Sequence, residues 1–321
     1  MSLRLLGILV SGLLLSWSAA PAAQDFPSRS IRIVVPFTPA GPVDVLGRLV
    51  AEKLSARWKS GVVVENRPGA GTVIGTEAVA RAAPDGHTLL LAVTSHAVNA
   101  TLIEKLPFDP VADFAPVLLA ATAQNLLVVN AAEPTRSVAE LIALAKANPG
   151  KLNVASPGKG TTLHLAAEML KIQAGVDYTI VHYKGSQPAT TALLSGEVAF
   201  MFDPGTVVPL AQAGKLRILA VAGPRRSAVL PDVPTMIESG LPGFEVVSWY
   251  GFFAPKGTPP AAIGELNRAI NEALRDGEVR ARMARINMEP AGGTPEELDR
   301  YLRRQIRIWG DVIRAANVRM E

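Results

Sequence analysis

The sequence contains no cysteine in its 321 residues. This absence excludes thiol nucleophiles, disulfide bridges, iron–sulfur clusters and cysteine-based zinc sites, together with a lipid-modified N-terminal cysteine. A basic tract is missing as well, because 32 Lys and Arg face 28 Asp and Glu, and the net charge of +4 is not gathered into a run with interleaved aromatics. The chain therefore lacks the footprint of a nucleic-acid-binding protein, and we expect no cofactor.

Long hydrophobic runs are absent after the N-terminus. There, Arg4 precedes an apolar stretch from Leu5 to Leu15, and several small residues follow. The stretch is well short of the roughly 20 apolar residues that cross a bilayer, which disfavours a membrane anchor. The pattern is typical of a secretory signal peptide over residues 1–23, cleaved after Ala22 or Ala23. We therefore expect export to a bacterial periplasm, with a mature protein that is soluble there.

Composition and patterning predict a globular α/β protein. The chain is 49% hydrophobic, with 27 Gly and 25 Pro. Its length is about twice the usual domain of roughly 150 residues, so two domains are expected. Short β-branched runs alternate with longer segments of helical period, which predicts largely parallel sheets. The expected strands span residues 31–35, 62–65, 88–93, 126–129, 152–155, 198–202 and 216–221.

Helix signals lie between these runs. An apolar stripe over residues 46–54 predicts an amphipathic helix after the first strand. A capping box at 137–140 opens a helix that ends at 148–150, and the segment 294–297 opens another near the C-terminus.

No long linker joins the two expected domains, so the chain must cross between them in short segments. Two stretches, 117–129 and 244–254, are apolar and extended in character and suit such crossings. The middle of the chain is then an insertion. We expect a first lobe from residues 24–125 and 246–321 and a second lobe from residues 126–245, with a ligand cleft between them.

Two loops each follow an expected strand and open an expected helix. PFTPAGPVD, residues 36–44, offers free N–H groups to an anion, or it is an ordinary turn in which Asp44 complements the helix dipole. SPGKGTTLH, residues 156–164, places two glycines ahead of a helix cap at Thr161 or Thr162, and an ordinary Gly-rich cap explains it equally well. Because the loops fall in different lobes, together they favour a ligand held from both sides.

Two further segments have competing interpretations. GAGTVIG, residues 69–75, has glycines spaced one residue too wide for a dinucleotide fingerprint, so we prefer a helix start near the domain interface. Asp203 ends a buried strand. Its carboxylate either faces the crevice and accepts a hydrogen bond from a ligand amine or hydroxyl, or it caps the turn at Pro204-Gly205.

Catalytic and metal-binding patterns are missing. The four histidines show no metal spacing, no Gly-x-Ser-x-Gly elbow occurs, and Lys159 precedes Gly160 where a P-loop needs Lys after its last glycine. His164 with Glu168 is more often a helix surface pair than half of a metal site. We therefore expect no metal and no enzyme. An exported hydrolase with His164 or His182 as base is the least favoured alternative.

Seven ordered segments carry a resemblance to a known family: PFTPAGPVD, VVVENRPGAGTVIGTEAVARAAPDGHTLLLA, LPFDPVADFAPV, LIALAKANPGKLNVASPGKGTTLHLA, HYKGSQPA, GKLRILAV and LPDVPTMIESGLPGFEVVSWYGFFAPKGTP. The chain resembles the extracytoplasmic solute receptors of tripartite tricarboxylate transport, the Bug family, over essentially all of its mature length. The resemblance implies a type II periplasmic binding protein fold, with two crossover strands and closure on the ligand by hinge motion.

The resemblance also implies a binding site. Family members hold a ligand carboxylate through backbone groups and bridging waters of two loops. The matching positions here are Phe37, Thr38, Ala40, Gly41 and Asp44 in one lobe and Ser156, Gly158, Gly160, Thr161 and His164 in the other. Asp203 matches a position that reads the distal part of the ligand, and Thr94, Ser95 and Trp249 complete the wall.

The family also implies partners. We expect a monomeric receptor that captures a small carboxylate and delivers it to a membrane transporter of one large and one small subunit. A sensor that presents the ligand to a signalling protein is the alternative. The chain departs from the family pattern at Ala40, where Gly is usual, and at Pro157 and Lys159. Lys159 either supplies a cation for a second carboxylate or lies in solvent.

Overall fold

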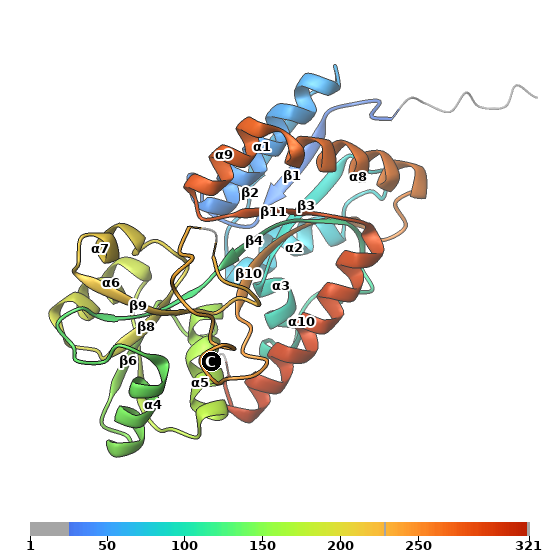
Figure 1. Ribbon diagram of the computed structural model, residues 1–321. Helices are drawn as coiled ribbons and strands as arrows, with labels where there is room; N and C mark the ends of the chain where they lie inside the picture. Colours follow the sequence, from blue (N-terminus) through green and yellow to red (C-terminus); the bar gives the residue numbers. More distant parts are fainter. Residues whose placement is uncertain (1–25, 228, 320–321) are drawn as a thin grey trace, which may run out of the picture.

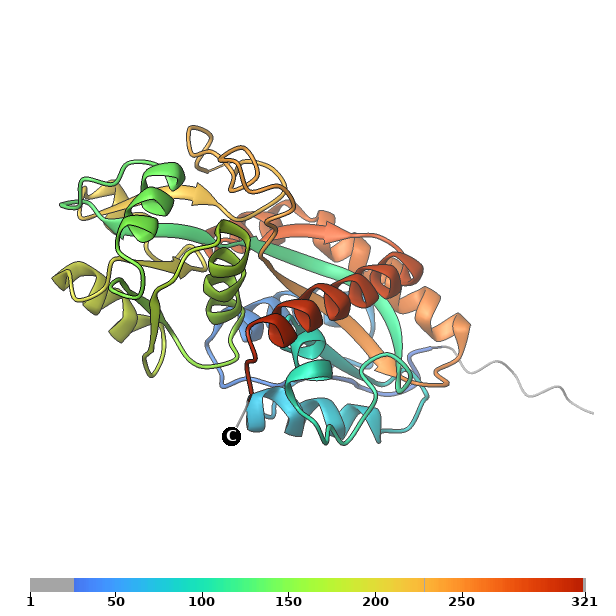
Figure 2. The same cartoon turned by 90° about the horizontal axis from the view of Figure 1, so that it is seen from below.

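The computed structural model describes residues 26–227 and 229–319, so the predicted signal peptide, residues 1–23, lies outside the described residues. Two β-sheets form the centres of two lobes, seen from two directions in Figure 1 and Figure 2. The strands are β1 (Ile31–Val35), β2 (Val62–Asn66), β3 (Thr88–Val93), β4 (Phe114–Gln124), β5 (Leu126–Asn130), β6 (Asn153–Ser156), β7 (Thr179–His182), β8 (Phe200–Asp203), β9 (Leu216–Val221), β10 (Val247–Pro255) and β11 (Glu289–Gly292).

The helices cover both sheets. They are α1 (Pro42–Arg57), the 3-10 turn η1 (Ala70–Thr72), α2 (Val73–Ala80), α3 (Ser95–Leu102), α4 (Val138–Ala147), α5 (Thr162–Ala174), α6 (Ser186–Ser195), α7 (Val208–Gln212), α8 (Pro260–Arg275), α9 (Gly277–Arg285) and α10 (Pro295–Ala315). In the part of the chain that the structure describes, none of them combines the length and apolarity needed to cross a membrane.

The first lobe is built on a six-stranded sheet of order β11-β4-β10-β3-β1-β2. β1 pairs in parallel with β2 and β3, whereas β10 runs antiparallel to β3 and β4, and β11 antiparallel to β4. Helices α1, α8 and α9 pack on one face of this sheet and α2, α3 and α10 on the other. Both faces are therefore covered, which explains why β1 and β3 consist almost entirely of buried apolar residues.

The second lobe is built on a five-stranded sheet of order β7-β6-β8-β5-β9. β6 pairs in parallel with β7 and β8, while β5 runs antiparallel to β8 and β9. The prediction of largely parallel sheets is therefore wrong, and both sheets are mixed. Every antiparallel pair involves β4, β5 or β10, the strands next to the crossings between the lobes.

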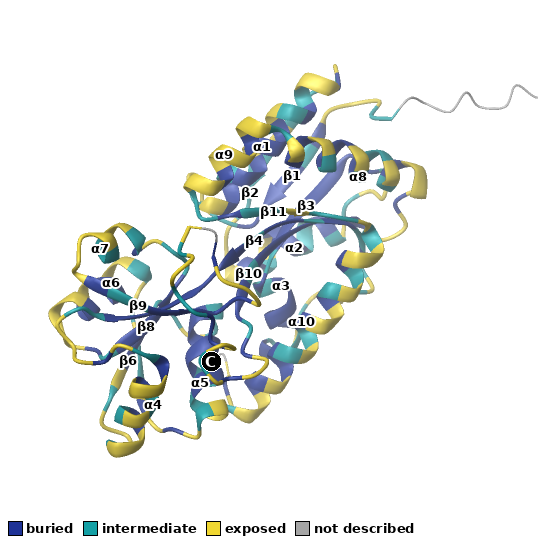
Figure 3. Ribbon diagram, in the orientation of Figure 1, coloured by how far each residue is buried: buried dark blue, intermediate teal, exposed yellow. Residues whose placement is uncertain are grey.

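The two crossings between the lobes are buried where they meet, at Asn125 and Val246 (Figure 3). They are also hydrogen-bonded to each other. Asn125, between β4 and β5, is fully buried, and its Nδ2 donates to the Val246 carbonyl at 2.9 Å. Its own carbonyl accepts from Ala222 N–H at 2.7 Å, and Ala222 accepts from Val246 N–H at 2.7 Å. The lobes are thus joined by two segments that are hydrogen-bonded to each other, and not by a flexible linker.

A large hydrophobic cluster extends from one lobe into the other. It includes Trp249 and Leu298 from the first lobe and Leu165 and Phe200 from the second. Figure 2 shows α10 lying along the first lobe and ending beside α5, with which it is in contact. On the side of the molecule that carries α3, α5 and α10, the two lobes are therefore in direct apolar contact.

Most expected strands lie within one or two residues of their observed bounds, and β7 and β11 were not expected. The expected crossing 117–129 corresponds to β4 followed by β5, and 244–254 overlaps β10. The predicted helix start at 294–297 is confirmed, and a capping box with both reciprocal hydrogen bonds forms there. The capping box predicted at 137–140 is only half present. Ser137 also caps its helix, but the Glu140 carboxylate accepts from Arg136 N–H instead of the N-cap N–H.

Candidate functional site

A cavity of about 450 Å³ lies between the lobes, where the N-termini of α1, α3 and α5 meet. The first lobe contributes Gly41, Thr94 and Trp249, and the second contributes Gly160 and Thr161. We call this space the interlobe cavity. The N-terminal N–H groups of a helix lack partners within the helix and carry a partial positive charge. Neither Gly41 nor Thr94 provides a side-chain cap to its helix, so α1 and α3 present such groups at the cavity.

The structure brings eight of the predicted site residues together on the cavity wall. They are Phe37, Thr38, Gly41, Thr94, Ser95, Gly160, Thr161 and Trp249. The other six, Ala40, Asp44, Ser156, Gly158, His164 and Asp203, do not line it. Ala40 and Asp44 belong to the loop before α1, and Ser156, Gly158 and His164 hold the loop before α5, so these five residues shape the two loops that line the cavity.

Asp44 orders the loop that precedes α1. Its buried carboxylate accepts hydrogen bonds from Ala40 N–H, Arg48 Nε and Asn66 Nδ2, each at 2.9 Å. Burial alone raises the pKa of Asp44, but these donors outweigh burial, so the pKa lies below its ordinary value and the group is charged. Ala40 has a φ of 68°, the left-handed region that an alanine rarely adopts, and the bond to Asp44 holds it there.

The second loop is held by its own side chains. Ser156 Oγ accepts from Gly158 N–H at 3.3 Å and donates to the Gly158 carbonyl at 3.1 Å. Thr161 caps α5 by accepting from His164 N–H at 3.2 Å. The His164 ring in turn accepts from Gly160 N–H through Nδ1 at 3.0 Å, so His164 fixes a cavity-lining glycine from behind.

His164 belongs to a small cluster below this loop. Its Nε2 lies 3.5 Å from Glu168 Oε1, and its ring meets that of His182 edge to face at 4.6 Å. Burial, followed by the neighbouring His164 and Lys159, lowers the pKa of His182. Among the described residues, no three His, Cys, Asp or Glu side chains group in a way that would hold a metal ion.

Asp203 is fully buried and turned into its own loop. Oδ1 accepts from Gly205 N–H at 2.7 Å and Val207 N–H at 3.1 Å, and Oδ2 accepts from the Thr206 hydroxyl at 2.8 Å. Burial raises the pKa of Asp203 against these hydrogen bonds. Of the two interpretations of Asp203, the structure therefore shows the turn cap. Its neighbour Pro204 lines the cavity in its place.

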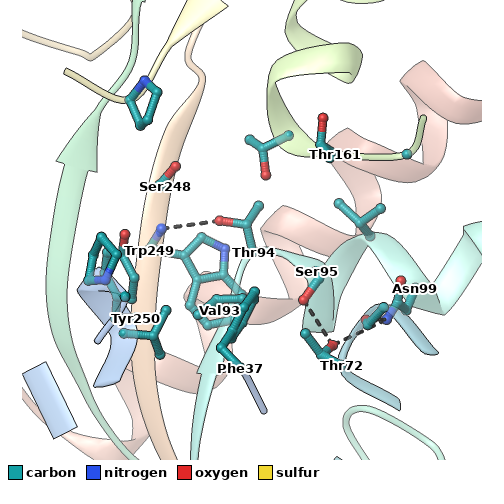
Figure 4. A pocket seen from close by; sticks show the side chains of 18 of the residues that line it. Phe37, Thr72, Val93, Thr94, Ser95, Asn99, Thr161, Ser248, Trp249 and Tyr250 are labelled. Carbon is teal, nitrogen blue, oxygen red and sulfur yellow. Dashed lines mark hydrogen bonds between the residues drawn. The ribbon is translucent and has the colours of Figure 1, made fainter. Parts of the chain in front are cut away.

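The predicted Ser95 belongs to a polar group on the first lobe whose other members, Gly71, Thr72 and Asn99, were not predicted as site residues (Figure 4). Thr72 Oγ1 lies 3.0 Å from Ser95 Oγ, and Asn99 Nδ2 donates to the Gly71 carbonyl at 2.9 Å. All four residues line the cavity. Thr72 has a φ of 83°, which a β-branched residue adopts only under constraint, and such strain clusters at ligand-binding positions. The glycines of the 69–75 segment are the available signal, and the predicted helix start near the domain interface is confirmed by η1 and α2, with Gly71 and Thr72 on the cavity wall.

The rest of the wall is mostly apolar, and its polar groups are mostly neutral. Further lining residues are Pro42, Val43, Val93, Val98, Leu102, Thr162, Ser248 and Tyr250. Burial raises the pKa of Tyr250 to about 12, which keeps its hydroxyl neutral. Lys159 is the one charged residue among the lining residues of the described chain.

Comparison with known proteins places the chain in a family. A family model described as the tripartite tricarboxylate transporter family receptor matches residues 46–318. Protein BugT of Bordetella pertussis is 37% identical over 322 aligned positions, covering 99% of each chain.

Solved structures agree with this match. The R. palustris protein Rpa4515, solved with adipate, is 36% identical with a TM-score of 0.79, covering 92% of this chain and 99% of that one. MatC of Rhodopseudomonas palustris, solved with malate, is 35% identical with a TM-score of 0.75, covering 90% and 100%. The fold is thus the two-lobed fold of periplasmic binding proteins. The chain is a receptor and not an enzyme, and it belongs to the tripartite tricarboxylate transporter receptor family, as BugT does.

Proposed function

We propose that the chain is a periplasmic receptor that binds a small carboxylate in the interlobe cavity and delivers it to a tripartite tricarboxylate-type membrane transporter. The observation that carries the proposal is the meeting of three helix N-termini from both lobes on one cavity. A carboxylate placed there accepts hydrogen bonds from main-chain N–H groups and is stabilised by the helix dipoles. Because the donors come from both lobes, binding favours the closed arrangement.

Relatives support this choice of ligand class. Rpa4515 was solved with adipate and MatC with malate, and both ligands carry carboxylates. In the present chain, Asp44 and Asp203, the acidic groups next to the cavity loops, are both saturated by donors of the protein. Neither carboxylate therefore requires a positively charged group on the ligand. No Asp or Glu is among the lining residues of the described chain, so no negative side chain on the wall repels a carboxylate ligand.

The lobes of the proposed receptor are residues 24–125 with 246–321, and residues 126–245. The change of sheet between β4 and β5, and again between β9 and β10, supports these bounds. The signal peptide over residues 1–23 is the proposed route to the periplasm.

Thermal unfolding tests the ligand class. The mature protein, residues 24–321, is unfolded and refolded to remove bound ligand, then heated with dicarboxylates, tricarboxylates, aromatic acids, acidic amino acids and neutral analogues. A ligand at 100 times its dissociation constant adds about 2.7 kcal/mol, which raises the melting temperature by roughly 5–10 °C. No shift with any carboxylate contradicts the proposal.

Gly41→Leu tests the location of the site. Gly41 has a φ of −77°, which any residue adopts, and the nearest protein atom to a Cβ built on it is the Thr38 carbonyl oxygen at 3.9 Å. The new side chain is expected to occupy the cavity and weaken carboxylate binding at least tenfold while the protein stays folded. Gly264→Leu, on the exposed surface of α8, is the matched control and should bind as the wild type does. Equal affinity in all three proteins, measured by calorimetry, would place the ligand elsewhere.

Delivery needs a separate experiment. Uptake of labelled ligand is measured in cells without the receptor, then with the wild type or Gly41→Leu restored. Restoration by the wild type alone, and only when both transporter subunits are present, supports delivery. A ligand-dependent transcriptional response with unchanged uptake supports the sensor alternative.

A further inference from the structure

The interlobe cavity is elongated along α3. Ser95, Val98, Asn99 and Leu102 all line it, with the spacing of one helix face. At a rise of 1.5 Å per residue, the seven steps from Ser95 to Leu102 span about 10 Å. A ligand anchored at the helix N-termini therefore has an extended space beside it, larger than the carboxylate needs.

The wall of that space is unsuited to a second charge. Lys159, the charged lining residue of the described chain, adjoins Gly160 and so lies at the anchor end. Farther along α3, Val98 and Leu102 are apolar, and Tyr250, beside Val93, has a neutral hydroxyl. An ammonium group or a further carboxylate buried there would lose its hydration without an ion to pair with.

Trp249 supplies one hydrogen-bond donor that the protein leaves unused. Its side chain is fully buried and lines the cavity, and Nε1 has no acceptor in the structure. Figure 4 shows the indole nitrogen on the side of the ring that faces Thr94 and Ser95. The ring is fixed in place, because Trp249 N–H donates to Thr94 Oγ1 at 3.1 Å and Tyr301 packs edge to face at 5.9 Å. Buried donors without acceptors are rare in native structures and call for an explanation.

We infer that the ligand is a monocarboxylate with an extended apolar body and one neutral acceptor oxygen, which accepts a hydrogen bond from Trp249 Nε1–H. This inference rests on the proposed carboxylate anchor and adds the substrate class. A keto or hydroxyl oxygen suits a single N–H donor whose neighbours in the wall, such as Thr94 and Ser95, are neutral. Both aliphatic and aromatic acids can carry such an oxygen, and the experiment distinguishes them with one pair of test acids of each kind.

The experiment uses pairs of acids that differ only in the acceptor. Binding of 7-oxooctanoate is compared with octanoate, and 4-acetylbenzoate with 4-ethylbenzoate, by calorimetry on the mature protein. At least one keto acid is expected to bind about fivefold to tenfold more tightly than its partner, and aspartate and citrate at least tenfold more weakly than that keto acid. The pair that shows the difference identifies the body.

Trp249→Phe removes the donor and keeps an aromatic ring. It is expected to abolish the preference for the keto acid, whereas Trp58→Phe, at the far end of α1, should keep it. If Trp249→Phe does not fold, 3-benzothienylalanine at position 249 replaces the N–H by sulfur with little change of shape. A keto preference that survives either replacement overturns the role of Trp249.

The failures are distinguishable. Binding of aspartate or citrate as tight as the best keto acid, or the absence of a keto preference in both pairs, overturns the substrate class and leaves the carboxylate receptor standing. If no carboxylate of any kind binds, the proposed function itself fails.

Discussion

Ala40 holds a conformation that suits glycine better. Its φ of 68° places it in the left-handed region, which costs an L-residue about 1–2 kcal/mol. Ala40→Gly relieves this strain, although glycine also loosens the unfolded chain by about 0.4–1 kcal/mol. We expect a net stabilisation of about 0.5–1 kcal/mol in urea unfolding. Ala143→Gly, on the exposed face of α4, should instead destabilise by about 1 kcal/mol, and equal signs for the two variants would show that Ala40 is unstrained.

His96 makes stability depend on pH. It is fully buried among Phe108, Phe114 and Phe253, and burial lowers its pKa from 6.5 to about 4. Between these two values the unfolded state binds more protons than the folded state, so stability falls as the pH drops from 6.5 towards 4. The loss amounts to about 3 kcal/mol.

His96→Phe is expected to flatten this dependence. The variant loses the hydrogen bond to the Pro110 carbonyl, at a cost of about 1 kcal/mol at pH 7, but it has no proton to take up. Urea unfolding of both proteins at pH 7.0, 5.5 and 4.5 gives the comparison. Parallel curves would show that His96 is not responsible.

Individual residues also mark how far the sequence reaches into the site. Gly41, Gly160 and Thr161 were found because glycine and helix-capping residues signal a helix N-terminus locally. Asn99 was missed because it lies inside a helical segment, and only packing against the 69–72 turn brings it to the cavity. For Asp203, a ligand contact and a turn cap both require a carboxylate that accepts hydrogen bonds, and only the fold of the following turn decides between them.

Among the elements, the crossings β4–β5 and β9–β10 depend most on a single side chain. Asn125 donates to the Val246 carbonyl, so Asn125→Ala leaves that buried carbonyl without its donor. We expect a loss of about 1–3 kcal/mol in urea unfolding. Asn153→Ala, on an exposed position of β6, should change stability by less than about 0.5 kcal/mol. A similar small effect at both positions would mean that the crossings are held by the main chain alone.

The elements also show what local patterns miss. β1 and β3 were predicted because their apolar runs are continuous, as buried central strands require. β7 and β11 lie at sheet edges and are only partly buried, so their residues carry no apolar run, and β11 contains Pro290 and Gly292. The direction of each strand depends on distant pairing, which explains why mixed sheets were mistaken for parallel ones.

At the scale of the whole molecule, contacts outside the crossings also join the lobes. α10 reaches α5, and Asn287, ahead of β11, donates to the Pro204 carbonyl at 2.7 Å. Pro204 lines the interlobe cavity, so the hydrogen bond from Asn287 joins the lobes at the cavity wall. Two lobes could be expected from chain length, but these contacts could not, because they join residues more than 80 positions apart.

Because the two crossing segments pair with each other, the length of the second lobe does not affect the strand pairing of the first. The chain leaves the first lobe at Asn125 and returns at Val246, one hydrogen bond away, and the pairing of β4 with β10 is already set at Gln124 and Val247. Residues inserted into or deleted from the second lobe therefore leave the frame of the first lobe in register. The part of the binding wall that the second lobe contributes, which includes Gly160 and Thr161, is thus free to diverge in length and sequence, while the larger part on the first lobe keeps its position.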